Sequence, residues 1–591
     1  MRTLLLLACC CITHFAFTQN FTLITDTNNP IVSEPTIGGT YFGTSWTDIN
    51  NDNKLDLFYG GTIYRNLGNG NFEIASGGNV IPTATALVGC SWGDYENDGD
   101  LDLIYSRFSA PSTLQTRIYA NDGTGQFTEV NSILNNINSA TWSVQWCDYN
   151  NDSHLDFILT FADMFLGANN HFPNRLYRGN SDGTFTEVIE DYEFLTELAP
   201  YTVSNWTDYD EDGDVDLFIA SGPAAGPTGI AADFIFKNLQ VETGSEGFEK
   251  LTSTDLSFAE ELQDGQCYNA IDYDNDGDLD ICLTNYSGVE NKFYKNENGN
   301  YVKTNTPFTI ANTSNLTNTW GDFDNDGDLD AIITASSTTG SGYFINNGDG
   351  TFTEKDVNLI NTITSGSSTG ATVGDYDNDG DLDVFIVGGS IKALFRNDLT
   401  IKNHFANFKL IGDTSNKAGL GARLELTARI KGKLVTQKRE ISASNTFMGH
   451  NSLRAHFGLG KSGRIIELKV YWPSGTIDTF SNLRVNRFYT IEEGKPLLNK
   501  PPKKKLSNSN PNVVLYPNPS KNSVRLAINN LPTIQESVSI KIMDLAGRNM
   551  LEKKFIPNDD IILDISKLPK ANYIIHVVVD KKTFTEKLTI Q

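Results

Sequence analysis

Seven short acidic segments are the residues of this chain best suited to chemistry. The last lies within GDYDNDGDLDVFI, residues 374–386, where five acidic residues alternate with other residues over nine positions. The seven segments begin at Asp48, Asp94, Asp148, Asp208, Asp272, Asp322 and Asp375. Like charges held this close together repel one another unless a cation neutralises them. We therefore expect each nine-residue segment, here called an acidic loop, to bind a metal ion.

The ligand set predicted for each acidic loop consists of oxygen atoms. Positions 1, 3, 5 and 9 carry oxygen-bearing side chains, and position 7 can offer its backbone carbonyl. Hard oxygen ligands without a histidine and cysteine set favour Ca²⁺, whereas Mg²⁺ usually keeps several waters in a strict octahedron. The predicted ligands are Asp48, Asn50, Asp52 and Asp56; Asp94, Glu96, Asp98 and Asp102; Asp148, Asn150, Asp152 and Asp156; Asp208, Asp210, Asp212 and Asp216; Asp272, Asp274, Asp276 and Asp280; Asp322, Asp324, Asp326 and Asp330; and Asp375, Asp377, Asp379 and Asp383.

Two other interpretations of the acidic loops are less favoured. An EF-hand would place Glu at position 12, but that position is Leu283, Ile333 and Ile386 in the last three loops. A solvated acidic turn without an ion would leave 32 of the 73 acidic residues of the chain repelling one another within seven short loops. Asn53 and Ser153 replace the usual Gly at position 6, so the loops at Asp48 and Asp148 are the weakest candidates. Seven near-copies at one repeated position predict up to seven structural Ca²⁺ ions rather than a catalytic centre.

The loops recur at intervals of 46, 54, 60, 64, 50 and 53 residues, which is typical of a propeller or a similar array. Each loop precedes a short β-rich run, an aromatic–Asn segment and a Gly turn, so we expect about four strands per repeat. This pattern predicts an all-β chain with a seven-bladed β-propeller, whose last blade the N-terminal FTLITDT strand completes. Trp46, Trp92, Trp146, Trp206 and Trp320 stand two residues before position 1. We interpret them as packing between blades; a sugar-stacking platform is the alternative.

Charge and composition limit the classes of partner. The net charge is −27, and residues 500–591 hold 15 basic and 8 acidic residues, so the rest of the chain carries −34. A nucleic-acid partner needs a basic surface and is not expected. Residues 1–18 read as a secretory signal peptide, and no later segment reaches the roughly 20 apolar residues of a membrane helix. Four cysteines remain after residue 18, and we expect small buried core residues, with one or two disulfides as the alternative.

With these loops and their β-rich surroundings, residues 19–402 resemble the FG-GAP/VCBS repeats of integrin-α-type propellers. The resemblance implies calcium in hairpin loops on one face and partners often on the opposite face. Residues 403–495, with HFGLG at 456–460 and VYWPSG at 470–475, resemble the ASPIC/UnbV domain, which implies an all-β module without a settled activity. His450 and His456 could suggest a site there, although hydrogen-bonded structural histidines are the favoured interpretation.

The C-terminal residues read as an export signal. Residues 496–511, rich in Pro, Lys, Ser and Asn, predict a linker. Residues 512–591 alternate apolar strands with turns, which predicts a small Ig-like β-sandwich. YPNPS, DLAGR and the terminal KLTIQ resemble the type A sorting domain of the type IX secretion system, with Ala571 in place of the usual Gly. The resemblance implies recognition by that secretion machinery and a secreted or outer-cell-surface location.

Two functions remain open from the sequence. The first is a calcium-stabilised binding or adhesion module for an extracellular polysaccharide or protein. The second is a polysaccharide lyase or hydrolase built on the same propeller, since the fold alone does not decide. Within the repeats, His154 and His171 are the only histidines, and His154 lies in an acidic loop. Few side chains of the repeats are therefore available to act as a general base, and we expect no catalytic residues.

Overall fold

Strands dominate this chain, and most of them form antiparallel sheets of four. The computed structural model describes residues 21–36, 41–79, 87–107, 116–137, 141–161, 172–199, 201–222, 231–336, 341–355, 368–389, 391–400, 403–497, 512–516, 523–529, 538–555, 561–579 and 582–590. The predicted signal peptide and most of the predicted linker lie outside these residues. The described helices have four residues each: α1 (Pro30–Ser33), α2 (Glu193–Thr196), α3 (Gln240–Thr243) and a 3-10 helix (Ile133–Asn136). The predicted all-β class is confirmed.

Seven sheets of four strands follow one another between residues 21 and 397. The first three are β2 (Thr44–Thr47), β3 (Asp56–Tyr59), β4 (Thr62–Gly68) and β5 (Asn71–Asn79); β6 (Leu87–Gly93), β7 (Asp102–Arg107), β8 (Arg117–Asn121) and β9 (Phe127–Glu129); and β10 (Thr141–Cys147), β11 (Asp156–Phe161), β12 (Arg175–Gly179) and β13 (Phe185–Glu187). The fourth is β14 (Tyr201–Thr207), β15 (Asp216–Ser221), β17 (Phe234–Asn238) and β18 (Phe248–Lys250), beside a two-stranded sheet of β16 (Ala231–Ala232) and β19 (Leu262–Gln263).

The last three sheets repeat the same order. They are β20 (Gly265–Ile271), β21 (Asp280–Asn285), β22 (Lys292–Glu297) and β23 (Asn300–Lys303); β24 (Asn315–Gly321), β25 (Asp330–Ala335), β26 (Gly342–Asn346) and β27 (Phe352–Lys355); and β28 (Ser368–Gly374), β29 (Asp383–Gly388), β30 (Lys392–Asn397) and β1 (Phe21–Leu23). The strand β1 pairs with β30 and supplies the fourth strand of the seventh sheet, as the sequence predicted.

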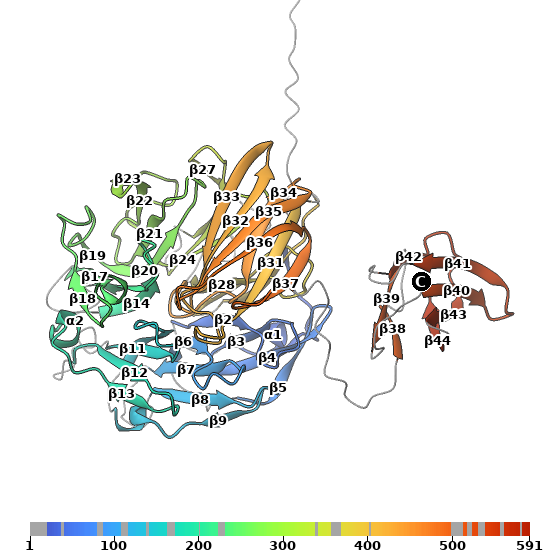
Figure 1. Cartoon of the computed structure of the whole chain (residues 1–591), viewed down its shortest axis with the longest axis horizontal. Helices are drawn as coiled ribbons and strands as arrows, with labels where there is room; N and C mark the ends of the chain where they lie inside the picture. Colours follow the sequence, from blue (N-terminus) through green and yellow to red (C-terminus); the bar gives the residue numbers. More distant parts are fainter. Residues whose placement is uncertain are drawn as a thin grey trace, which may run out of the picture. The chain divides into compact units, whose positions relative to one another are not determined.

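The first strands of neighbouring sheets lie side by side in a closed order. The strands β2, β6, β10, β14, β20, β24 and β28 contact one another in this order, and β28 contacts β2. Figure 1 shows these sheets fanned around the axis that their first strands share, in colours from blue to yellow-green. Four-stranded sheets in this arrangement fit the blades of a propeller, which leaves no exposed edge between the first and last repeats.

Aromatic residues at two fixed positions of the repeat join neighbouring sheets. In three repeats the Trp two residues before an acidic loop stacks on the Tyr at position 2 of the preceding loop: Trp146 on Tyr95, Trp206 on Tyr149, and Trp46 on Tyr376. The ring centroids of Trp46 and Tyr376 are 5.5 Å apart with planes at 11°, and this pair links the first sheet to the seventh. The tryptophans therefore pack between sheets, as predicted.

Residues 403–497, the middle domain, form two sheets in the same compact unit as the seven repeats. One contains β34 (Ala455–Gly460), β31 (His404–Ile411) and β37 (Arg487–Glu492); the other contains β33 (Lys433–Glu440), β32 (Arg423–Ile430), β35 (Arg464–Tyr471) and β36 (Ile477–Arg484). Residues of the middle domain share a hydrophobic core with residues of the second and third repeats. In Figure 1 the orange strands of the middle domain stand against one side of the ring of sheets.

Residues 498–591 form a separate unit. Its two sheets are β38 (Asn512–Tyr516), β39 (Ser523–Asn529) and β42 (Ile561–Asp564); and β41 (Asn549–Phe555), β40 (Val538–Asp544), β43 (Asn572–Val579) and β44 (Lys582–Thr589). Both sheets contribute to one core, which includes Leu526, Ile540 and Ile575. Among the described residues, no helix has the length and apolar character needed to cross a membrane.

Candidate metal centres

Every acidic loop connects the first and second strands of its sheet, and its ninth residue begins the second strand. In the seventh loop, Asp375 accepts the backbone N–H groups of Asp379 and Gly380, both at 3.0 Å. Asp383 accepts the N–H of Tyr376 at 3.0 Å and that of Asn397, on the third strand, at 2.8 Å. Position 9 accepts the same two N–H groups in all seven loops. The backbone thus holds these carboxylates in place.

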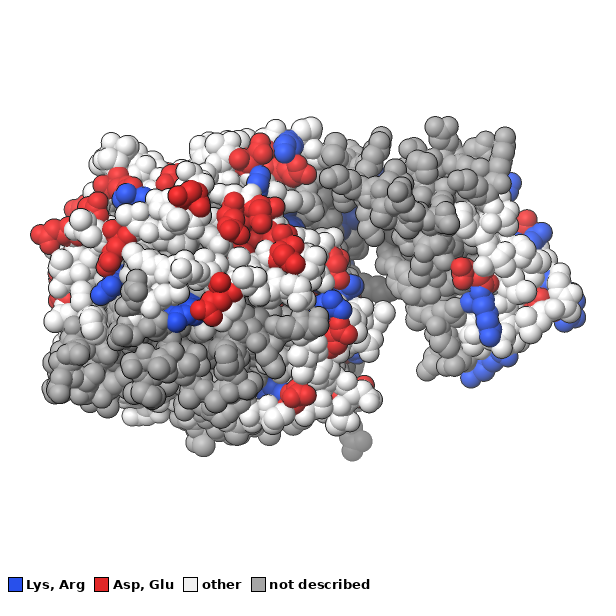
Figure 2. Space-filling view, turned by 90° about the horizontal axis from the view of Figure 1, so that it is seen from below, with Lys and Arg blue, Asp and Glu red and all other residues white. Residues whose placement is uncertain are grey.

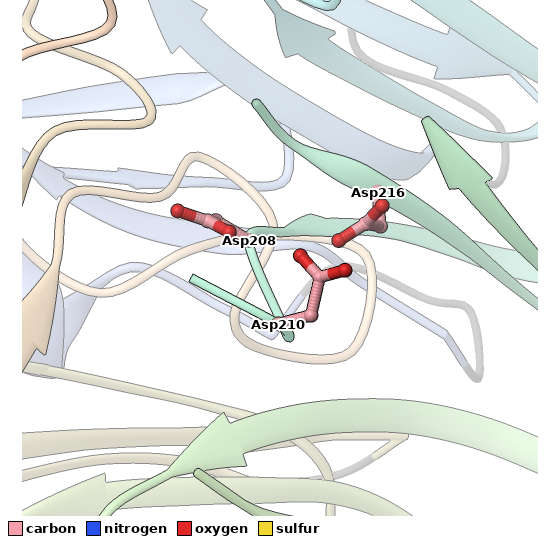
Figure 3. A group of neighbouring side chains, drawn as sticks. All are labelled: Asp208, Asp210 and Asp216. Atoms are coloured by element: carbon pink, nitrogen blue, oxygen red, sulfur yellow. The ribbon is translucent and has the colours of Figure 1, made fainter. Parts of the chain in front are cut away.

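Four of the seven loops bring three predicted ligands together. In each, one carboxylate oxygen of every member lies within 4.8 Å of the others. The groups are Asp208, Asp210 and Asp216; Asp272, Asp274 and Asp276; Asp322, Asp324 and Asp326; and Asp375, Asp377 and Asp383. Figure 3 shows the carboxyl groups of the first of these, drawn from the loop and from the start of β15, close together around one space.

The other three loops do not gather three carboxylates within that distance, although all their residues are described. Two of them, at Asp48 and Asp148, carry the amides Asn50 and Asn150 at position 3, and the loop at Asp94 has the longer Glu96 there. Asp210 and Asp212 form a further group with Glu242 of α3, which the loop spacing could not predict. Lys237 pairs with all three of these acidic residues.

The electrostatics of the loops suit a divalent cation. Burial raises the pKa of Asp102 to about 9 and that of Asp280 to about 8, because desolvation disfavours their charged forms. Asp208 Oδ1, Asp272 Oδ1 and Asp274 Oδ1 are buried and have no hydrogen-bond donor among the described residues. Buried carboxylate oxygens without donors are what a hard cation requires. Figure 2 shows acidic side chains gathered in several groups on the described surface, with single basic side chains between them.

Position 4 of the acidic loops has a role that the search for metal ligands missed. It has a left-handed backbone, with φ between 54° and 62°, in all seven loops. In six of them this residue is Asn, which tolerates that conformation, and its Nδ2 donates to the backbone carbonyl at position 6 of the next loop at 2.9–3.1 Å. The six residues are Asn51, Asn97, Asn151, Asn275, Asn325 and Asn378. The recurrence of Asn at position 4 in six of the seven loops is the sequence signal that could have revealed these links.

The link between the fourth and fifth loops is made differently. Glu211 occupies position 4 of the fourth loop and has no amide to donate. Lys438 of the middle domain lies there instead, with Nζ 2.6 Å from both carboxylate oxygens of Glu211. The same ammonium group donates to the carbonyl of Gly277 at position 6 of the fifth loop. The middle domain therefore completes the circle of seven loop-to-loop links.

The middle domain contacts every acidic loop. Its basic side chains reach carboxylates: Lys409 lies 3.5 Å from Asp48, Arg423 lies 3.5 Å from Asp208, and Lys431 lies 2.8 Å from Asp326. The second, third, fifth and seventh loops are contacted through hydrogen bonds of Lys417 to Asn97, Asn416 to Asp148, Lys438 to Gly277 and His456 to Gly380. The acidic face of the ring is thus covered by a domain of the same chain.

Residues 441–452, here called the hub segment, extend from the middle domain into the centre of the ring. Met448 accepts the backbone N–H of Cys90 at 2.9 Å, and the N–H of His450 donates to Thr44 at 3.3 Å. Phe447 and Met448 are fully buried against residues of several first strands, including Val203 and Leu316. Side chains of the hub segment therefore fill this part of the centre of the ring.

Two further predictions about single residues are confirmed. His450 Nδ1 lies 2.6 Å from the carbonyl oxygen of Asn451, and His456 Nε2 lies 3.1 Å from that of Gly380. Burial lowers the pKa of both imidazoles to about 4. They are buried structural histidines bonded to the backbone. Cys90, Cys147, Cys267 and Cys282 are buried free thiols.

Three family models match parts of the chain. The FG-GAP-like repeat matches residues 48–105, 108–159, 272–333 and 322–386. The ASPIC and UnbV family matches residues 412–497, and the secretion system C-terminal sorting domain matches residues 514–591. No curated protein matches the chain.

Similarity to solved structures is weak. Dimeric latent PorU from Porphyromonas gingivalis is 12% identical over 69% of this chain and 35% of its own, with a TM-score of 0.12. The BSP domain of a biofilm associated protein is 10% identical over 94% of this chain and 97% of its own, also with a TM-score of 0.12. The chain spans about a third of the length of the PorU chain. TM-scores this low carry no argument about fold or function.

Proposed function

Since the chain carries FG-GAP-like repeats, an ASPIC and UnbV domain and a type IX sorting domain, it is exported to the extracellular space or the cell surface, and we propose that it acts there as a calcium-bound binding module. In this proposal the seven sheets are the blades of a seven-bladed propeller, and residues 512–591 are an Ig-like sorting domain. The ligand is a polysaccharide or a protein. Calcium occupies the acidic loops and serves architecture rather than chemistry.

The observation that carries the calcium proposal is the set of buried carboxylates held by backbone N–H groups with further oxygens left without donors. Asp208 and Asp216 are buried in this way, Asp208 Oδ1 has no donor among the described residues, and the exposed Asp210 completes the group. The residues present therefore fit calcium. When bound, the ion would neutralise the loop and fix its carboxylates relative to one another. The protein's own residues orient the ligands through the backbone and connect one loop to the next.

Few residues remain available for catalysis, and this favours binding over an enzymatic function. Of the three histidines of the middle domain, His450 and His456 are buried and bonded to backbone carbonyls, and His404 Nδ1 lies 2.9 Å from Asn486 Nδ2. The carboxylates that cluster within 4.8 Å belong to the acidic loops or adjoin them. The hub segment fills part of the centre of the ring. A polysaccharide lyase or hydrolase is the second candidate, because propellers host such enzymes and the fold alone does not decide.

The test uses the calcium-loaded chain and a panel of soluble and insoluble polysaccharides. Retention on each polymer and release of oligosaccharides are measured in the same samples. We expect retention without new oligosaccharide ends. Release of oligosaccharides would replace the binding module with the enzyme. Absence of retention on every polysaccharide would direct the proposal to a protein ligand, to be sought by crosslinking on the cell surface.

A further inference from the structure

The junction between the fourth and fifth sheets departs from the repeat at two positions. Ala270 stands two residues before position 1 of the fifth loop, where five repeats have Trp. Glu211 stands at position 4 of the fourth loop, where six loops have Asn. A repeated scaffold needs the same residues at each junction for packing. Two departures at one junction therefore mark it as different from the other six.

The structure has a cleft at this junction. Asn269 and Ala270 of β20 are half-buried, whereas every residue of the corresponding strands β10, β14, β24 and β28 is buried. The cleft has a volume of about 120 Å³. It lies between the ring and the middle domain, and its lining includes Trp206, Ala270, Trp320, Arg423, Lys438 and Arg439. An engineered cavity of about 150 Å³ holds benzene, so this smaller space admits part of a sugar ring and leaves the rest of the sugar outside the cleft.

Of the three basic residues that line the cleft, Arg439 is the one without an ion pair. Lys438 is engaged by Glu211, and Arg423 by Asp208 and Glu211. No described residue forms an ion pair with Arg439. Three of its five N–H groups donate to the carbonyls of His456 and Lys438 and to Gln437 Oε1. Two N–H groups of this guanidinium therefore remain for a ligand.

The acidic residues of the cleft already have other partners in the proposed calcium-bound chain. Glu440 accepts a hydrogen bond from Thr207 at 2.9 Å. Asp272 is position 1 of the fifth loop and would be a ligand of its ion, on the function proposed above. Arg439, which is held over the ring of Phe457 at 5.0 Å, lies in the field of Asp272 and Asp322 but forms no ion pair with either, so its two remaining N–H groups are the donors that the cleft offers. A half-buried guanidinium with unused N–H groups favours a ligand that carries a carboxylate.

The other walls define what else the ligand must carry. Trp206, Ala270, Ile271 and Trp320 provide apolar surface. The half-buried side chains of Asn269, Ser442 and Asn445 also line the cleft. Asn269 Nδ2 already donates to Asn318 and the Ser442 hydroxyl bonds to Ser444, so Asn269 Oδ1 and the Asn445 amide are the groups that can bond to hydroxyls. A ligand with a compact ring, several hydroxyl groups and one carboxylate satisfies all three features.

We propose that the cleft between β14, β20 and the middle domain binds one uronic acid residue of an acidic polysaccharide. The carboxylate of the sugar accepts the free N–H groups of Arg439, its ring lies partly in the space that Ala270 leaves, and its hydroxyl groups meet the amides. This site rests on the binding function proposed above and names its ligand class. Binding involves no covalent change.

The experiment is calorimetric titration of the calcium-loaded full chain with galacturonate, glucuronate and mannuronate, with galactose as the neutral control. We expect at least one uronate to bind and galactose to bind at least tenfold more weakly. Ala270→Trp fills the cleft with the residue that five other repeats carry, and should weaken uronate binding at least tenfold. Arg439→Gln should do the same, while Arg429→Gln, whose exposed guanidinium lies on β32, should bind like the wild type.

Thermal melting of each variant separates loss of the site from loss of the fold, and Ala270→Leu replaces Ala270→Trp if the latter melts early. Failure of all three uronates to bind, equal binding of galactose, or unchanged affinity in the folded Ala270 variants would overturn the proposal. Retention on polymers distinguishes failure of the cleft proposal from failure of the proposed binding function. A folded Ala270→Trp chain retained like the wild type removes the cleft but leaves polysaccharide binding, whereas a wild-type chain retained by no polymer removes both the cleft and the polysaccharide ligand and leaves only a protein ligand for the binding module.

Discussion

Lys438 Nζ lies 2.6 Å from each carboxylate oxygen of Glu211, and it also donates to the carbonyl of Gly277. The two charged residues are 227 positions apart and belong to the middle domain and to the fourth acidic loop. Six other loop-to-loop links are made within the ring by asparagines. At this junction the ring therefore depends on the middle domain.

Lys438→Met should lower the stability of the chain and Glu211→Asn should restore part of it. The Lys438 side chain is 10% exposed and that of Glu211 24% exposed, so removing the ammonium leaves a carboxylate poorly solvated at a cost of about 1–3 kcal/mol. Asn at position 211 can donate to Gly277 as the other six asparagines do. Denaturant unfolding of both single variants and the double variant measures this coupling. If the double variant loses as much stability as the two single variants together, the link between Lys438 and Glu211 is contradicted.

Removal of calcium should lower the melting temperature reversibly. Each site contributes about 2.7 kcal/mol when calcium is at 100 times its dissociation constant. Metal analysis should find up to seven ions, and Asp208→Asn and Asp322→Asn should each remove one. Asp349→Asn, at an exposed turn outside the acidic loops, is the matched control. Identical melting curves in chelator and in calcium would exclude a structural role for the metal.

Phe447→Ala should destabilise the ring and the middle domain together. The side chain is fully buried in the hub, and truncating a buried Phe costs about 3–5 kcal/mol. Because the hub segment bonds to first strands of several sheets, one unfolding transition should shift as a whole. Leu434→Ala, at a side chain that is 62% exposed on β33, should change little. Separate transitions for the repeats and the middle domain in the wild type would show that the hub segment does not couple them.

Acidification should destabilise the chain through His456. Burial lowers its pKa in the folded state to about 4, against about 6.5 when unfolded. Between these values the unfolded chain binds a proton that the folded chain does not. The free energy of unfolding therefore falls as the pH drops from 6.5 to 4, and the contribution of the neutral His456 is fully present above pH 6.5. The neighbouring groups are the Gly380 carbonyl, Arg439 and the stacked ring of Phe405. In saturating calcium, His456→Gln should reduce this pH dependence without abolishing it, because burial also lowers the pKa of His450 to about 4; an unchanged slope would assign the dependence to other groups.

Local periodicity predicted much of the ring. The acidic loops gave its repeat length, the β-rich runs gave its strands, and the Trp before five of the loops predicted packing that pairs such as Trp206 and Tyr149 confirm. The N-terminal strand was predicted because FTLITDT resembles the fourth strands of other repeats and the seventh repeat lacks one. These features are readable because each depends on residues at fixed spacing within one repeat.

The covering of the acidic loops by the middle domain was not predictable in the same way. No spacing relates Arg423 to Asp208 or Lys438 to Glu211, since such contacts depend on how two folded parts meet. The asparagines at position 4 were visible in the sequence, but they are not metal ligands and a search for ligands passed over them. The sequence marked the loops at Asp48 and Asp148 as the weakest candidates, but it does not reveal that the loop at Asp94 also keeps its carboxylates apart, because that depends on side-chain placement.

The pairing of β1 with β30 has a consequence for how the chain folds. Phe21 lies opposite Asn397, so one of the first strands of the chain pairs with a strand about 370 residues later. Closing so long a loop carries an entropic cost, and contacts this distant in sequence slow folding. A chain truncated before residue 397 lacks a complete seventh sheet, and one truncated before residue 452 lacks the hub segment as well. Final ring closure must therefore wait until both distant partners are present, and the stable ring is a late product of folding.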